Sequence, residues 1–315
     1  VRWLPHDWIR FIWPWRSKHY ARMVLDEVKP DVVHIQSHII IGRGLARIAH
    51  ERGIPVIATN HVMAENILDH STFPKFIDNL VLRFAWADAK RTFDLTRAVT
   101  TPTRRAADFL ERTVDVEGVI PISCGIDRTQ YRPVVAPREK NRMVFVGRLT
   151  AEKQVEVILK AMTKLDPALD VTFDIVGGGD QRKNLETLTR ELGLQDRVTF
   201  HGRTTDAQLR ALLSRASLFV IASIAELQSI ATMEAMASAL PIVAANAVAL
   251  PHLVQDGVNG YLFEPGNSSE LAARLTAVLT ADPAEYERMQ RASLDGVAVH
   301  DINRTLDTFE ALYRD

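Results

Sequence analysis

The sequence predicts an α/β protein with two domains, each built on a parallel sheet covered by helices. Two observations support this fold class. From Pro30 onward, short β-branched runs alternate with amphipathic stretches of helical length, which is the pattern of parallel strands connected by helices. The length of 315 residues exceeds that of one small domain and accommodates two domains of ordinary size.

The strands fall into two series separated by a linker. The first series is expected at residues 31–36, 55–60, 98–101 and 118–122. Residues 128–141 are rich in proline and charge and lack periodicity, so we interpret them as the inter-domain linker. The second series is expected at residues 143–147, 172–176, 198–201, 218–222 and 242–245. We therefore assign three parts, namely a first domain, a second domain and a terminal helix crossing back toward the first, at residues 1–138, 139–298 and 299–315.

Composition and charge restrict the function classes. With 47% hydrophobic residues, 24% charged residues and a formal net charge of -1, the chain has no global bias toward nucleic acid. A single cysteine, Cys124, excludes an intrachain disulfide framework and is typical of a reducing compartment. The longest uncharged run contains Pro241 and Pro251, so it does not predict a transmembrane helix. We expect a cytoplasmic protein.

The loop after the fourth strand of the second domain is the richest in chemistry. Ligands of open parallel sheets bind at the carboxyl ends of the strands. Here the backbone N–H groups of Ser229 and its neighbours Gln228 and Ile230 would donate to a phosphate, while Glu226 and Glu234 would accept from sugar hydroxyls. A helix start whose acidic residues are favoured by the helix dipole would show the same pattern.

Two further loops of the second domain suggest an anion site. Arg148 and Lys153 follow Gly147 near a predicted helix N-terminus, where each cation costs about 0.3–1 kcal/mol unless an anion binds. A diphosphate would relieve this conflict; solvated surface charges are the alternative. Gly177 and Gly178 would let a nucleobase or phosphate approach the backbone, although their run does not fit the G-x-G-x-x-G fingerprint and could be purely conformational.

One histidine of the first domain is a further candidate. His61 directly follows the strand expected at residues 55–60, where it would face the cleft between the domains. A lone histidine at the end of a strand is more often simply hydrogen-bonded. His61 by itself leaves the choice open.

Taken together and in this order, these features resemble the GT-B glycosyltransferases of family 4. The features are Gly147-Arg148 with Lys153, Glu226-x7-Glu234, His61, the triple glycine at residues 177–179 and the turn at residues 122–127. The resemblance covers essentially the whole chain from Pro30 onward. It implies two Rossmann-like, doubly wound domains facing a cleft, the N-terminal one incomplete, and retaining transfer of a sugar from a nucleotide diphosphate donor such as a UDP-sugar or GDP-sugar.

The resemblance also implies a role for each residue. The implied catalytic residues are His61, Arg148, Lys153 and Glu226, and the implied donor-binding residues are Gly147, Gly177, Gly178, Gln228, Ser229, Ile230 and Glu234. Fixed cations beside the diphosphate would stabilise the charge that develops as the glycosidic phosphate bond breaks. The sequence has no Asp-x-Asp motif, the usual metal-holding motif of the other large glycosyltransferase architecture. We expect neither a metal ion nor any cofactor besides the donor substrate.

The first residues point to a membrane-surface acceptor. Aromatic side chains that favour the headgroup level alternate there with cations that attract anionic lipid, namely Trp3, Trp8, Trp13 and Trp15 with Arg10 and Arg16. The alternatives are a buried aromatic patch and a strip that is exposed only because the preceding sequence is absent. Residues 59–66, 123–127 and 225–229 are also similar to the diacylglycerol and glycolipid branch of the family, which implies transfer of glucose or mannose to a lipid or glycolipid at the inner face of the cell membrane.

Some residues depart from the family pattern. More typical members carry Asn at the position of Cys124 and Gly at that of Leu227, and they begin with a strand and a glycine-rich loop that are not evident before Asp31. The first part of the N-terminal domain is therefore expected to be missing. Three alternatives follow: a truncated, non-catalytic sugar-nucleotide-binding module, a glycosyltransferase with a soluble small-molecule acceptor, and a nicotinamide-dependent oxidoreductase, against which the absent dinucleotide fingerprint counts.

Overall fold

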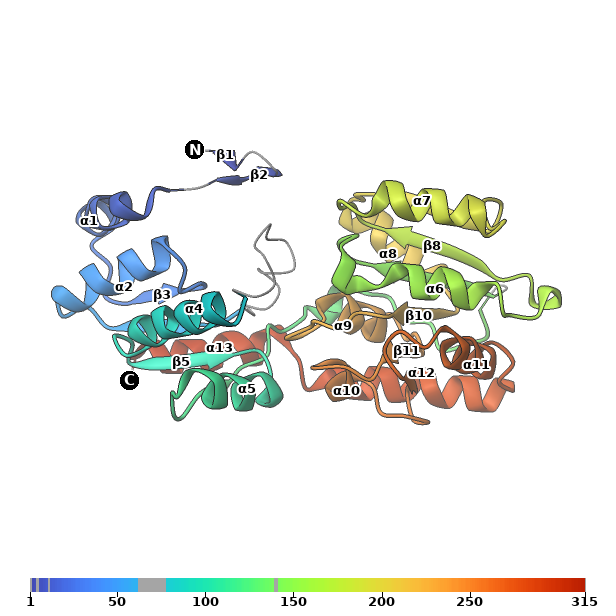
Figure 1. Cartoon of the computed structure of the whole chain (residues 1–315). Coiled ribbons are helices and arrows are strands. Elements are labelled where there is room, and N and C mark those ends of the chain that lie inside the picture. The colour runs from blue at the N-terminus through green and yellow to red at the C-terminus, as the bar shows by residue number, and fades with distance from the viewer. Residues whose placement is uncertain (1, 4–5, 11, 62–77, 139–140, 315) are drawn as a thin grey trace. The chain divides into compact units, whose positions relative to one another are not determined.

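The computed structural model describes residues 2–3, 6–10, 12–61, 78–138 and 141–314. It forms two compact units (Figure 1). Unit 1 comprises Val1–Ser123 and Leu306–Asp315, and unit 2 comprises Cys124–Thr305. The two parallel α/β units predicted from the sequence are present.

The boundary between the units lies earlier than the predicted one at residue 138. The segment that we interpreted as a linker belongs to unit 2 because its side chains and backbone are bound there. Tyr131 packs against the unit 2 core, and Arg138 donates to the carbonyl of Ser238 at 2.8 Å. Gln290 also donates to the carbonyl of Val134. A segment rich in proline and charge therefore lies along the surface of unit 2 instead of joining the units freely.

Unit 1 contains a parallel sheet with the strand order β3-β4-β5-β6. These strands are Val33–Ile35, Val56–Thr59, Ala98–Thr101 and Ile120–Pro121. Because a helical connection returns the chain to the starting end of the sheet after each strand, consecutive strands run parallel and lie side by side. The helices are α1 (Ser17–Val28), α2 (Ile41–Glu51), α4 (Asp78–Phe93) and α5 (Arg104–Val114). Their apolar faces and the strands bury one core that includes Leu25, Ile35, Ile48, Trp86 and Leu110.

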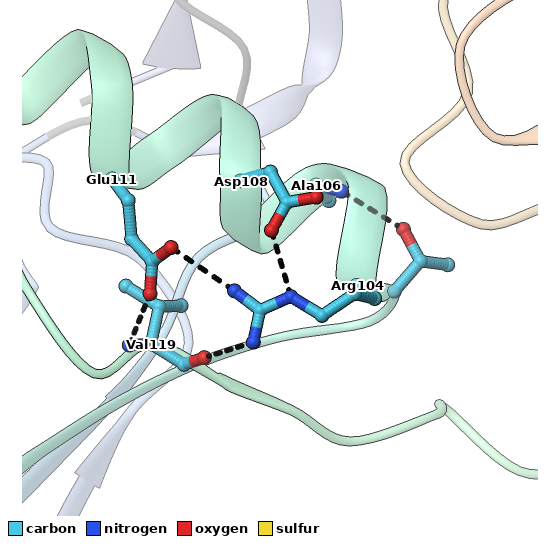
Figure 2. Close-up of polar contacts among 6 residues, drawn as sticks. Arg104, Ala106, Asp108, Glu111 and Val119 are labelled. Carbon is cyan, nitrogen blue, oxygen red and sulfur yellow. Dashed lines mark hydrogen bonds and ion pairs between the residues drawn. The ribbon is translucent and has the colours of Figure 1, made fainter.

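Helix α5 shows how side chains fix one element of unit 1 against the sheet. Thr103 caps its N-terminus by accepting from the amide of Ala106, which satisfies one of the donors left unpaired at a helix start. Arg104 donates to Asp108 at 2.8 Å and to Glu111 at 3.0 Å, while Glu111 accepts from the amide of Val119 (Figure 2). This network ties the helix to the residue that precedes β6.

Two short antiparallel strands precede α1, where the sequence suggested no strand. β1 (Arg2–Trp3) pairs with β2 (His6–Arg10). A two-residue strand has too little periodicity to be recognised from its sequence. Trp3, Trp8 and Arg10 lie in these strands, but their side chains are outside the described part of the structure.

Unit 2 has a parallel sheet with the strand order β12-β11-β10-β7-β8-β9. The strands are β7 (Arg142–Val146), β8 (Thr172–Val176), β9 (Val198–Gly202), β10 (Leu218–Ile221), β11 (Ile242–Ala245) and β12 (Gly260–Phe263). This is the doubly wound Rossmann order, which reverses between the first strand, β7, and the fourth, β10. The carboxyl ends of those two strands form the topological switch point where such folds bind ligands.

Helices cover both faces of this sheet (Figure 1). α6 packs against α7 and α11, and α9 packs against α12. The helix bounds are α6 Val155–Met162, α7 Arg182–Glu191, α8 Asp206–Arg215, α9 Ile230–Ala237, α10 Leu250–Leu253, α11 Ser268–Leu279 and α12 Pro283–Ala298. The strands are buried between these layers, so they read as continuous apolar runs; their largest fully buried side chains include Phe145, Phe173, Phe219 and Phe263.

The last helix, α13 (Ile302–Arg314), begins in unit 2 and ends in unit 1. In unit 1, Phe309 and Tyr313 contact the imidazole of His34 on β3. Within the described ranges, no helix is both long enough and apolar enough to cross a bilayer.

Candidate functional site

The loops after β7, β8 and β10 meet at the switch point of unit 2. The amide of Leu149 donates to the carbonyl of Gly178 at 3.0 Å, which joins the first two loops. The amide of Ile224 donates to the carbonyl of Glu152 at 3.0 Å, which joins the first and third. Every unit 2 residue predicted for the site lies in these three loops or in α9, which follows the third.

The glycines of this region allow two backbones to touch. Gly177 has a φ of +130°, and a Cβ there would lie 1.9 Å from the carbonyl oxygen of Gly147. Only glycine fits such a position. A Cβ on Gly178, in contrast, would meet nothing within 4 Å. Gly177 is thus required by the fold itself, and Gly178 leaves open space over the backbone that a flat ligand could occupy.

Lys153 and Glu226 form an ion pair across two of the loops. Lys153 ends the 3-10 turn Ala151–Lys153, and its Nζ lies 2.6 Å from Oε1 of Glu226. Both side chains are only 12% exposed, so each charge needs its partner. An ammonium group has three N–H donors and a carboxylate has several acceptor positions. The pair can therefore hold its own geometry while offering donors to a phosphate and an acceptor oxygen to a hydroxyl.

Arg148 is placed differently from Lys153. Its side chain is exposed, and within the described residues it forms no ion pair. It lies on the same loop, one residue after Gly147. An exposed guanidinium is free to move to an anion that arrives, whereas Lys153 is already fixed.

The third of these loops leads directly into α9. Ser229 is the N-cap and is 4% exposed; its hydroxyl accepts from the amide of Thr232 at 3.2 Å. The amide of Met233 donates to the carbonyl of Ser229. The next amides toward the helix start, those of Ile230 and Ala231, have no intrahelical acceptor. A helix start of this kind favours an anion.

Gln228 and Glu234, two further predicted donor-binding residues, are hydrogen-bonded to residues near the start of unit 2. Oε1 of Gln228 accepts from the amide of Cys124 at 2.7 Å. Oε1 of Glu234 accepts from the hydroxyl of Tyr131 at 2.8 Å. Burial raises the pKa of the Glu234 carboxyl, and the hydrogen bond from Tyr131 opposes that rise. Both Gln228 and Glu234 are thus oriented before any ligand binds.

In unit 1, His61 follows β4 and lies beside β3. Its Nε2 is 2.8 Å from Oε1 of Gln36, and partial burial lowers the pKa of the imidazole. The neighbouring His34 is joined to Thr59 at 2.6 Å and to Tyr313 at 2.7 Å. His61 is hydrogen-bonded and also lies at the end of its strand. The geometry within unit 1 is therefore compatible both with a histidine that contacts a ligand and with one that is simply hydrogen-bonded.

Exposed tryptophans and cations gather before and beside α1. Trp13 and Trp15 stack with ring centroids 4.8 Å apart and are 47% and 73% exposed, which excludes the buried aromatic patch for these two residues. Arg16 is also exposed. Beside them lies a cavity of about 220 Å³, lined by Pro14, Trp15, Ser17, Lys18, Arg43, Gly44 and Arg47.

Sequence reasoning missed the residues that hold the site together. Tyr131 lies in the predicted linker, although an isolated aromatic residue in a polar segment can indicate an anchoring contact. Glu152, which is 7% exposed and accepts from the hydroxyl of Thr150 at 2.6 Å, gave no signal. Among the described residues, no group of three or more His, Cys, Asp or Glu side chains is arranged to hold a metal ion.

Two α/β units, one with the 3-2-1-4-5-6 Rossmann order and a phosphate-compatible switch point, define a fold of the GT-B glycosyltransferase type. The family profile described as "Glycosyl transferases group 1" matches residues 127–294, and that of "Glycosyltransferase Family 4" matches residues 1–130. The chain belongs to the group 1 glycosyl transferases.

Individual relatives agree with this assignment. The chain is 30% identical over 267 residues to the MMP alpha-(1->4)-mannosyltransferase of Mycolicibacterium hassiacum, with 82% of this chain and 64% of that protein covered. It is 26% identical over 264 residues to the sulfoquinovosyl transferase SQD2 of Arabidopsis thaliana, covering 80% and 50%. Thus the chain spans between half and two thirds of these curated relatives' lengths.

The fold is also similar to that of a solved structure. Anabaena HepE, crystallised in complex with UDP, superposes with a TM-score of 0.78 at 20% sequence identity, with 94% of this chain and 82% of that chain covered. At that identity the similarity concerns the fold alone.

Proposed function

We propose that this protein transfers a hexose from a nucleotide diphosphate sugar to a lipid or glycolipid at a membrane surface. The observation that carries the proposal is the buried Lys153–Glu226 pair beside the N-terminus of α9, at the switch point of unit 2. One ammonium, one carboxylate and two helix-start amides are the groups that a sugar diphosphate requires. The UDP in HepE supports a nucleotide donor.

In the proposed reaction the bond between the anomeric carbon and the diphosphate oxygen breaks, and its electron pair leaves with the diphosphate. Lys153, Arg148 and the amides of Ile230 and Ala231 stabilise that charge. The acceptor hydroxyl attacks the same face of the sugar, which retains the configuration, and its proton passes to a leaving-phosphate oxygen. Glu226 accepts from hydroxyls of the donor sugar, Glu234 accepts from those of the ribose, and His61 contacts the sugar. Because cations of the chain stabilise the leaving group, the reaction needs no metal ion.

The acceptor side of the proposal rests on unit 1. Stacked, exposed tryptophans favour the headgroup level of a bilayer, and the cavity beside them is lined by Lys18, Arg43 and Arg47. Asp88 accepts from Arg43 at 2.7 Å and Glu51 lies 3.6 Å from Lys18, whereas Arg47 forms no ion pair with any residue that the structure describes. A lipid with an anionic headgroup would complement this surface, at the inner face of the cell membrane.

A screen of donors against acceptors, with mass detection of products, tests the proposed reaction. UDP-glucose and GDP-mannose are combined with diacylglycerol or glycolipid in vesicles and with soluble sugars, each with and without EDTA. A hexosylated lipid, formed equally with EDTA, is the expected product. A product formed from soluble sugars alone would show that the acceptor is a soluble molecule. Donor binding without any product would indicate a binding module. Loss of activity with EDTA would contradict the metal-independent mechanism.

Vesicle binding tests the membrane surface separately. Each surface cation is worth about 1 kcal/mol toward anionic lipid, so Arg47→Ala should weaken binding to anionic vesicles roughly fivefold, and Trp15→Ala should weaken it further. Arg112→Ala, which removes an exposed arginine from α5, is the matched control. Equal binding by all three variants and the unaltered protein would reject the membrane role.

A further inference from the structure

Tyr131 contacts one of the two carboxylates of the proposed donor site. Its hydroxyl donates to Oε1 of Glu234 at 2.8 Å, across a large separation in sequence. No other hydrogen bond is described for the Glu234 side chain, so Oε2 is left to accept from a ligand. The contact joins the segment before β7 to the helix after β10.

The tyrosine is held rigidly on its side of this contact. It follows the 3-10 turn Arg128–Gln130, which Asp127 caps by accepting from the amide of Thr129 at 3.0 Å. The ring packs against the unit 2 core. Gln130 is fixed in turn by Asp127 at 3.0 Å and by Arg210 of α8 at 3.3 Å. The hydroxyl position is thus determined by a capped turn and by packing, without any ligand.

We propose that Tyr131 is a positioning residue of the donor site, whose hydroxyl fixes the Glu234 carboxylate so that its second oxygen accepts from the ribose hydroxyls. This inference rests on the proposed function, because it assumes the role assigned to Glu234. Tyr131 itself need not touch the donor.

The electrostatics of the pair agree with this role. An ionised carboxylate accepts hydrogen bonds more strongly than a neutral one. Burial raises the pKa of Glu234, Asp206 of α8 raises it further, and both Tyr131 and Arg210 lower it. Without the Tyr131 hydroxyl, burial would still raise the pKa of Glu234, and the hydrogen bond that lowers this pKa most would be lost. The hydroxyl therefore orients Glu234 and also favours its charged form.

Tyr131→Phe tests the inference because it removes only the hydroxyl and keeps the packed ring. We expect the dissociation constant for UDP-glucose or GDP-mannose, whichever the protein binds, to rise about tenfold, which corresponds to about 1.4 kcal/mol. The turnover of bound donor should change little. Because the pKa of Glu234 rises in this variant, its binding should also weaken at a higher pH than that of the unaltered protein when measured by calorimetry from about pH 8 down to about pH 5.

Two further variants separate positioning from folding. Tyr286→Phe removes a buried hydroxyl that donates to the carbonyl of Ser217 at 2.6 Å, so it should lower stability without moving the pH dependence of donor binding. In a Glu234→Gln background, Tyr131→Phe should have little further effect, since the two residues act as one unit.

The outcomes separate failure of the proposed function from failure of the inference about Tyr131. If the unaltered protein binds neither donor, the proposed function fails and the inference fails with it. If the unaltered protein binds a donor and Tyr131→Phe binds it equally well or more tightly, with the same pH dependence, only the inference is overturned. Tighter binding would mean that Tyr131 competes with the ribose for Glu234.

Discussion

The two units differ in how they fix the polar residues at the ends of their strands. In unit 2 these polar residues are fixed by an ion pair and by a capped helix start: Lys153 binds Glu226, and Ser229 caps α9. In unit 1 they are held by imidazoles. His34 joins Thr59 and Tyr313, and His38 is 6% exposed against Trp86 and Phe93.

This difference indicates a division of work between the units. Paired charges keep a fixed site in place for an anionic ligand, because the groups are oriented before it arrives. Neutral imidazoles can sit beside apolar surface without a counter-ion, and desolvation lowers the pKa of His34, His38 and His61. Under the proposed function, the paired charges of unit 2 would bind the sugar diphosphate and unit 1 would bind the acceptor.

The largest expected effect comes from breaking the ion pair of unit 2. Lys153→Ala should reduce kcat about 10²–10³-fold, a loss of about 2.7–4 kcal/mol of transition-state stabilisation. It should also destabilise the fold by up to about 3–5 kcal/mol, since Glu226 is left buried without its counter-ion. Steady-state kinetics with the preferred donor and thermal unfolding measure the two effects.

A paired variant separates stability from catalysis. Lys153→Met combined with Glu226→Gln removes both charges and should recover much of the lost stability while turnover stays low. Lys160→Ala, an exposed lysine on α6, is the matched control. Turnover that returns together with stability would remove Lys153 from the diphosphate site.

A smaller effect is expected from acid at the strand ends of unit 1, where His34, His38 and His61 lie. Histidine is the side chain that ordinarily changes charge between about pH 5 and pH 8. A histidine whose pKa is lowered by folding contributes stability above its unfolded pKa of about 6.5, and this contribution is lost as the pH falls through its folded pKa. Amide exchange at residues 33–38 and 56–60 should therefore accelerate between about pH 7 and about pH 5.

The comparison region in unit 2 is the pair of segments at residues 147–154 and 222–229, neither of which contains a histidine. Their exchange should respond less to the same change in pH after correction for the intrinsic rate. His38→Phe should reduce the response in unit 1, whereas His50→Gln, at an exposed histidine of α2, should not. An equal response in the two regions would contradict this difference between their strand ends.

Much of the fold could be predicted because buried parallel strands carry a strong local signal. The expected bounds of β5, β8 and β11 agree with the structure. β12 was not expected because it begins at Gly260, where a Cβ would lie 1.8 Å from the carbonyl oxygen of Ile242. A glycine inside a strand weakens the sequence signal for that strand, and here the close approach to β11 requires it.

The sequence could place the candidate residues at one edge of the second sheet, but it could not predict the bonds between them. Gly147, Lys153, Glu226 and Ser229 were expected at one edge because parallel strands bring their carboxyl ends together, and the family resemblance implied that they act as one group. That Lys153 binds Glu226 directly depends on side-chain conformations across two loops. The contact of Tyr131 with Glu234 depends on how a segment without periodicity folds back, which local propensity does not encode.

The location of the diphosphate in a crystal structure of the protein with its preferred donor tests the central claim most directly. We predict that phosphate oxygens lie about 3 Å, hydrogen-bonding distance, from Nζ of Lys153 and from the amide nitrogens of Ile230 or Ala231. A diphosphate bound away from these groups, or on another face of unit 2, would contradict the proposed site and the mechanism that depends on it.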